Sequence, residues 1–119
     1  DVKKDEDVEE ARKIASNMPL MIQVGNVGVV HAQPVDDWNY MIQNTSDKYM
    51  NDYVQWGRDV ITKNVPFFCK NIDRVFCGHT PVSAPVILGN VFFIDTGAVY
   101  GKHLTICNSA GTVVFPLED

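Results

Sequence analysis

The sequence of 119 residues has no excess of basic charge, no long hydrophobic run and no paired-cysteine pattern. Ten Lys and Arg against fifteen Asp and Glu, a formal charge of −5, argue against nucleic acid or an anionic membrane as the main partner. No apolar run approaches the roughly 20 residues that span a bilayer. Three scattered cysteines form no CxxC pair and no disulfide framework, which favours a reducing cytoplasm. The chain opens without Met and without a secretory leader pattern, so we expect a processed product or a fragment.

What is present is an ordinary globular composition, 45% hydrophobic, at a length that fits one small domain. Apolar residues at helical spacing predict a short helix over 1–17, ended by Pro19. Residues 34–66 carry aromatic and apolar side chains at helix-like intervals, and 75–77 read as a strand. Paired apolar runs joined by Gly and Asn predict three hairpins: 20–24 with 29–32, 85–88 with 91–94, and 104–107 with 112–115. The sum is an α+β fold of mostly antiparallel hairpins with a helical insert.

Two histidines follow apolar strands, at the place where many folds carry reactive groups. His31 ends one strand and His79 lies just after another. Imidazole is a common ligand for Zn, Mn and Fe. Gly78 would allow the backbone to approach a metal or phosphate closely, and Thr80 with Pro81 would fix the loop. The alternative for either His alone is an ordinary hydrogen bond, because a metal site needs clustered ligands.

Three other residues have both a functional and a structural interpretation. Arg58 could clamp phosphate oxygens, or it could form a surface ion pair with Asp59 or Asp52. Asp95 could cap a turn or orient a ligand His through a hydrogen bond. Tyr100 could pack in the core or place its hydroxyl near a substrate.

Five segments, in chain order, form a series that resembles a known family. They are PLMI at 19–22, VHA at 30–32, WGR at 56–58, GHTP at 78–81 and IDTGAVYG at 94–101. The series resembles the C-terminal half of the phosphoprotein-phosphatase branch of the calcineurin-like metallophosphoesterases, in particular the small protein phosphatases of bacteriophage lambda and enterobacteria. The likeness spans residues 19 to about 107, and the order of VHA, GHTP and IDTGA makes it specific.

The resemblance implies an αββα sandwich in which two divalent ions, Mn before Zn or Fe, activate a water that attacks a phosphate ester. Such an ion pair clamps the nucleophile and the ester oxygens together. As supporting groups around the ligands we expect Gly78, Thr80 and Asp95. The residues that the resemblance marks are His31 and His79 as ligands of one ion, and Arg58 and Tyr100 as catalytic residues.

The family's N-terminal motifs, GDxHG, GDxxDRG and GNHE, are absent, and no GD or NH dipeptide occurs in the sequence. Residues 1–119 therefore resemble the C-terminal portion of one metallophosphoesterase domain, inactive or nearly so alone. Its partners would be the missing N-terminal half, which should meet apolar surface here, and a phosphoprotein or other phosphate ester. The expected whole is a cytoplasmic serine/threonine-type protein phosphatase. The alternatives are a diadenosine-tetraphosphate hydrolase of the same superfamily and a non-catalytic binding module.

Overall fold

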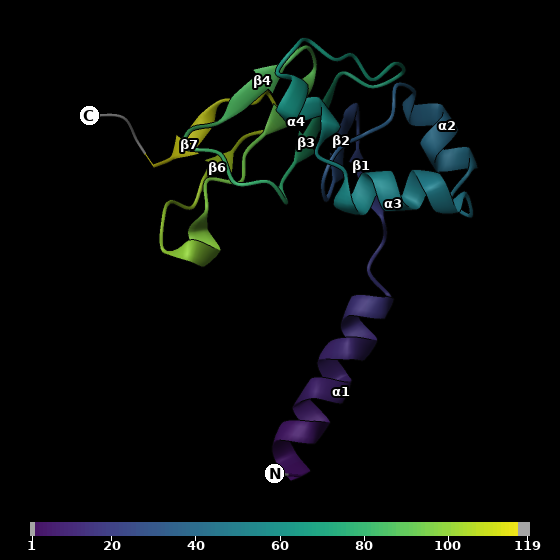
Figure 1. The fold of residues 1–119 in the computed structure, drawn as a ribbon, viewed down its shortest axis with the longest axis vertical. Coiled ribbons are helices and arrows are strands. Elements are labelled where there is room, and N and C mark those ends of the chain that lie inside the picture. Colours follow the sequence, from purple (N-terminus) through teal and green to yellow (C-terminus); the bar gives the residue numbers. More distant parts are fainter. Residues whose placement is uncertain (1, 117–119) are drawn as a thin grey trace.

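The computed structural model describes residues 2–116 and shows an α+β fold, as the sequence predicts (Figure 1). A helix comes first, a mixed sheet and three short helices follow, and a small hairpin closes the chain. The helices are α1 (Val2–Ser16), α2 (Trp38–Gln43), α3 (Lys48–Trp56) and α4 (Asp59–Lys63), with a 3-10 turn, η1, at Ala98–Tyr100. The strands are β1 (Met21–Val24), β2 (Val27–Val30), β3 (Arg74–Cys77), β4 (Val86–Leu88), β5 (Val91–Phe93), β6 (Ile106–Cys107) and β7 (Val113–Phe115).

The five strands of the main sheet run in the order β1-β2-β3-β5-β4. All three expected hairpins are present, because β1 pairs with β2, β4 with β5 and β6 with β7, each antiparallel. The two central pairings, β2 with β3 and β3 with β5, are parallel, which the hairpin pattern did not anticipate. A parallel connection needs a crossover of a dozen residues or more. The helical insert α2–α4 supplies it between β2 and β3, and residues 78–90, which include β4, supply it between β3 and β5.

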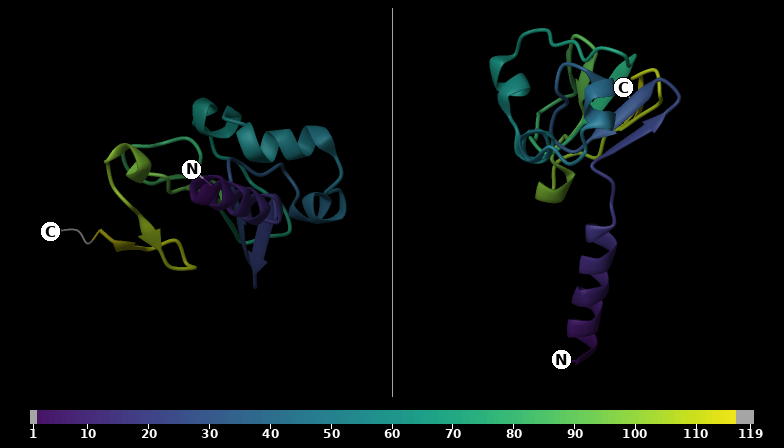
Figure 2. Two further views of the ribbon diagram at one scale, coloured as in Figure 1. Left: turned by 90° about the horizontal axis from the view of Figure 1, so that it is seen from below. Right: turned by 90° about the vertical axis from the view of Figure 1, so that its right-hand side faces the viewer.

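The core lies on one face of this sheet, under α2, α3 and α4 (Figure 2). Trp38, Met41 and Val54 from the helices are fully buried against sheet residues such as Val75. Gly28 of β2 makes this packing possible, because a Cβ added there would lie 2.5 Å from the Trp38 ring. The insert is thus fixed directly over the strand that leads to His31.

The opposite face of the sheet carries an apolar row that crosses all five strands in register. Its members, from one edge to the other, are Ile22, Val29, Phe76, Phe92 and Ile87. The β6–β7 hairpin covers the middle of the row, where an added Cβ on Gly111 would lie 2.2 Å from the Phe92 ring. Ile22, Val29 and Ile87 remain 43–57% exposed, so the row is covered only in part.

Helix α1 projects away from the rest of the molecule, as Figure 1 shows. It ends at Ser16, close to the expected end near Asn17. Its described side chains, from Lys4 onward, are exposed. Most are charged, so the helix offers too narrow an apolar stripe to bury against the body.

Candidate functional site

Three neighbouring parallel strands end at one edge of the sheet, and the candidate residues come directly after them. His31 follows β2, His79 lies two residues after β3, and Asp95 lies two residues after β5. The ladder continues past the strands, because the Gly78 backbone N–H donates to the His31 carbonyl at 2.8 Å. The carboxyl ends of parallel strands are where such sheets hold ligands. Parallel pairing therefore collects residues that are far apart in the chain.

His31 and His79, called the His pair below, are 48 residues apart in sequence and in contact in space. The Nε2 atom of His31 lies 3.1 Å from the Nδ1 atom of His79, and the ring centroids are 4.9 Å apart. Two nitrogen ligands of one ion must lie within about 5 Å of each other, and the His pair meets this requirement. A separation of 3.1 Å suits a hydrogen bond, and it equally suits two adjacent ligands of one ion with bonds of about 2.1 Å.

The turn that carries His79 is strained. His79 has a φ of 70°, and the Thr80 backbone N–H donates to the Gly78 carbonyl at 2.8 Å. A hydrogen bond between residues two apart, with positive φ at the centre, defines the rare kind of γ-turn. Gly78 itself does not have positive φ, and an added Cβ there meets only ordinary contacts from 3.6 Å. The unusual backbone conformation thus falls on the candidate ligand and not on its glycine neighbour.

The surroundings of His79 favour its neutral form. Partial burial is the main cause that lowers its pKa, and the nearby imidazole of His31 and charge of Arg58 add to it. The backbone of Trp56, as a hydrogen-bond partner, and the carboxylate of Asp95 act in the opposite direction. A neutral imidazole is the form that binds a metal ion.

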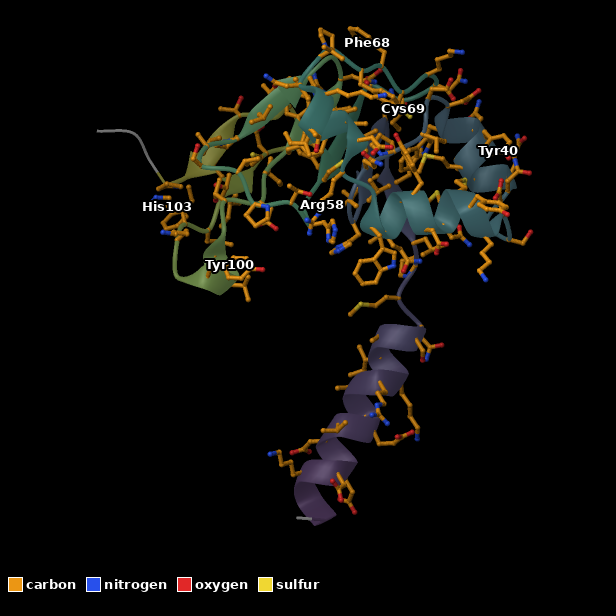
Figure 3. The ribbon with its side chains drawn as sticks, viewed as in Figure 1. Tyr40, Arg58, Phe68, Cys69, Tyr100 and His103 are labelled. Carbon is orange, nitrogen blue, oxygen red and sulfur yellow. The ribbon has the colours of Figure 1, made fainter. Side chains whose placement is uncertain are left out.

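Arg58 and Trp56 approach the His pair from the helical insert. Arg58 is exposed and lies at the start of α4, where Figure 3 shows it on the side of the body that faces α1. Its charge is close enough to lower the pKa of His79. The Trp56 ring, at the end of α3, meets the His79 ring edge-on with centroids 5.7 Å apart. The structure thus brings a guanidinium, two imidazoles and an aromatic wall to one place.

Asp95 caps a turn and also faces the His pair. Its Oδ1 accepts a hydrogen bond from the Gly97 backbone N–H at 3.0 Å. Its other oxygen, Oδ2, lies 3.9 Å from the position of a Cβ on Gly78. Of the two interpretations of Asp95, the hydrogen bond supports turn capping. Toward His79 the carboxylate acts through its negative charge, which raises the pKa of the imidazole.

Tyr100 does not join this group. It lies at the end of η1 with 71% of its surface exposed, and Figure 3 shows it beside His103 and apart from Arg58. Together with Pro81 and Lys102 it lines a separate hollow of about 440 Å³. Since Pro81 is two residues from His79, this hollow begins within about 7 Å of the His pair along the chain.

The resemblance implies a bound metal ion. The two imidazole nitrogens of the His pair are suitable ligands for part of the coordination shell of such an ion. The two facing nitrogens can serve as neighbouring ligands of one ion. Over residues 2–116, no group of three or more His, Cys, Asp and Glu side chains is placed to hold a metal. The described residues thus supply two nitrogen ligands, and the remaining positions would be filled from outside them.

Two residues near Arg58 escaped the sequence reasoning. Gln33 is fully buried, and its amide occupies the space that a Cβ on Gly57 would need. The only indication in the sequence was that Gln33 is a polar residue within the short segment from His31 to Pro34. Its residue type alone does not reveal that it packs against Gly57. Gly57 was visible as part of WGR, but the reason for a glycine there was not.

No protein-family model matches the sequence. Among the described residues, no helix has the length and apolar character needed to cross a membrane.

Proposed function

We propose that this chain is the C-terminal portion of a metallophosphoesterase domain, and that the whole domain is a metal-dependent protein phosphatase of the serine/threonine type. The observation that supports this most is the His pair. Two histidines picked from separate motifs lie 3.1 Å apart at the carboxyl ends of adjacent parallel strands. Adjacent parallel strands bring their ends together whatever the function, but here the two ring nitrogens also face each other, as two ligands of one ion would.

In the proposed site, His31 Nε2 and His79 Nδ1 hold one divalent ion, for which Mn is our first choice over Zn or Fe. When bound, a pair of such ions supplies an activated water and positive charge for the phosphoryl oxygens. The chain's own contribution is to present two ring nitrogens in fixed positions. Partial burial lowers the pKa of His79 and so favours the unprotonated form that can bind a metal.

Arg58 binds the phosphate in this proposal. A guanidinium offers several N–H donors in a planar fork that matches two phosphate oxygens. Arg58 is exposed beside the His pair, so its donors can reach an anion held there. Because charge on those oxygens is redistributed in the transition state, a preorganised donor there lowers the barrier.

The exposed apolar row supports the proposed partner. In a sheet that is buried on both faces, the strands carry apolar residues on both sides. In a sheet with one face in solvent, apolar and polar residues alternate along each strand. The row runs apolar across all five strands, yet Ile22, Val29 and Ile87 remain 43–57% exposed. We infer that the absent N-terminal half, with the remaining metal ligands, packs on this face.

We place the protein in the cytoplasm, because its three cysteines are free thiols and two of them, Cys69 and Cys77, are buried in the core. Secreted domains of this size usually pair their cysteines.

Steady-state kinetics on an aryl phosphate test the proposal, with the full-length protein measured across a Mn series. His79→Asn removes a metal ligand, so turnover should fall and excess Mn should restore part of it. Arg58→Ala should lower the rate by about thirty- to a thousandfold, from a loss of about 2–4 kcal/mol, with no rescue by metal. Arg12→Ala on α1 and His103→Asn are matched controls and should leave the rate unchanged.

Normal kinetics of Arg58→Ala would show that Arg58 does not bind the phosphate. Normal kinetics of both site variants would reject the phosphoesterase assignment and favour a binding module. A phosphopeptide and a dinucleoside polyphosphate, compared as substrates, separate the phosphatase from the diadenosine-tetraphosphate hydrolase.

A further inference from the structure

Gln33 is the one polar side chain other than Thr96 among the buried residues of the described chain, and it lies two residues after His31. Its Oε1 accepts a hydrogen bond from the Val60 backbone N–H at 3.0 Å. Its Nε2 is buried and has no hydrogen-bond partner among the described residues. Burying an amide with an unpartnered donor is unfavourable, whereas Met or Leu would fill the same space without that cost. The acceptor oxygen is therefore the feature that sets Gln33 apart from an apolar residue.

That oxygen caps helix α4 from a distance. Arg58 occupies the N-cap position of α4, but its side chain makes no capping hydrogen bond. Gln33 accepts from Val60, a first-turn N–H that the helix itself leaves without a partner. The position of Arg58 at the helix start thus depends on a side chain from the segment that carries His31.

A second hydrogen bond ties the same segment to the preceding helix. The Ala32 backbone N–H donates to the Val54 carbonyl, near the end of α3, at 2.8 Å. The link between α3 and α4 consists of Gly57 and Arg58. Residues 32 and 33 therefore fix both sides of the short connection from which Arg58 projects.

Gly57, in the connection between α3 and α4, packs directly against the side-chain amide of Gln33. A Cβ there would lie 1.8 Å from Gln33 Nε2 and 2.5 Å from the Tyr53 carbonyl, so the connection lies directly on the buried amide. No residue larger than glycine can take this position unless the amide or the connection moves.

We propose that Gln33 is a positioning residue that sets Arg58 in register with the His pair, and this rests on the proposed phosphatase function. His31 and Gln33 belong to one short segment. The hydrogen bond from the Val60 N–H to Gln33 therefore ties the position of Arg58 at the start of α4 to the position of His31, a proposed metal ligand. Gln33 touches neither substrate nor metal and acts through Arg58. Displacing a binding group by about 1 Å can lower a rate by about a hundredfold.

A double-mutant cycle between Gln33→Met and Arg58→Ala tests this in the full-length enzyme. Gln33→Met keeps the side-chain volume and removes both the acceptor and the unpartnered donor. We expect it to lower kcat/KM for an aryl phosphate by about ten- to a hundredfold. The double variant should be no slower than Arg58→Ala alone, because the effect of Gln33 passes through Arg58. The Mn dependence should not change, since both histidines remain.

Two further variants keep the result interpretable. Gln33→Glu retains an acceptor oxygen for the Val60 N–H, but its second oxygen is buried without a partner, so the variant should be less stable than the parent. Below its thermal midpoint its kcat/KM should stay closer to the parent than that of Gln33→Met. Asn51→Ala removes a comparable amide, which donates to the Thr45 carbonyl at 2.8 Å near the start of α3. It should lower the thermal midpoint without changing kcat/KM, as a merely structural loss does.

The outcomes separate this proposal from the proposed function. If Arg58→Ala is normal, the role of Gln33 is overturned, while the proposed function is overturned only if His79→Asn is normal as well. If Arg58→Ala is slow and Gln33→Met is normal, or if the two losses multiply in the double variant, only the role of Gln33 is overturned. A Gln33→Met loss that Asn51→Ala reproduces at equal thermal midpoint would also overturn it, because general destabilisation would then explain the rate.

Discussion

Replacing His79 by glycine and by alanine isolates the strain of its turn. Both variants lose the imidazole, so their difference reports only on the backbone at φ 70°. An L-residue in the left-handed region costs about 1–2 kcal/mol, which glycine avoids. Glycine in turn adds roughly 0.5–1 kcal/mol of unfolded-chain entropy. We therefore expect His79→Gly to be more stable than His79→Ala by about 0.75 kcal/mol, the difference between the midpoints of these two ranges.

Urea denaturation of the two variants at a common slope gives this difference from the shift in midpoint. Ala84→Gly is the control, because Ala84 is exposed in the loop after His79 and is not among the positive-φ residues. There glycine should destabilise by about 0.4–1 kcal/mol. If glycine destabilises position 79 by the same margin relative to alanine, the turn stores no strain and the reasoning is refuted.

Three further predictions concern the core, the thiols and the response to pH. Gly28→Ala should destabilise by about 1–3 kcal/mol in urea, because the new Cβ overlaps the Trp38 ring, and a neutral effect would contradict the packing. The thiols of Cys69, with its pKa raised to about 12, and Cys77, also raised by burial, should resist iodoacetamide at pH 8 until the chain unfolds. In the metal-free chain, NMR should show the pKa of His79 below 6.5, and the unfolded state should then bind protons first as pH falls. Stability should accordingly drop as the pH falls through 6.5 to the lower folded pKa, and His79→Asn should reduce that drop.

The hairpins were predictable because their signals are local. Gly25 and Gly89 adopt positive φ in the turns that join two of them, as the Gly-Asn patterns indicated. The parallel pairings of β3 were not predictable in the same way. They depend on which strand a crossover connection places next to β3. The sequence of residues 74–77 does not indicate which strands will pair with it.

In the candidate site, too, the features with a local sequence signal were predictable, and those that depend on tertiary packing were not. The meeting of His31 and His79 followed from two motifs and the rule that strand ends gather at one edge. The positive φ of His79 did not follow, because no local pattern assigns the left-handed region to a residue that carries a side chain. The contact of Gln33 with Gly57 depends on how two helices meet over the sheet, which no local pattern encodes.

The most direct test of the central claim is whether one ion binds both members of the His pair. The chain contains three histidines, so its imidazole NMR resonances are few, and His103 on the exposed loop serves as an internal control. Substoichiometric Zn²⁺, which is diamagnetic, should shift the His31 and His79 resonances together, with one apparent affinity, and leave His103 unshifted. Calorimetric titration with Mn²⁺ should give only weak binding, because Mn prefers oxygen ligands that this chain does not add. A shift of only one member of the pair, or equal shifts of all three histidines, would contradict a shared metal site.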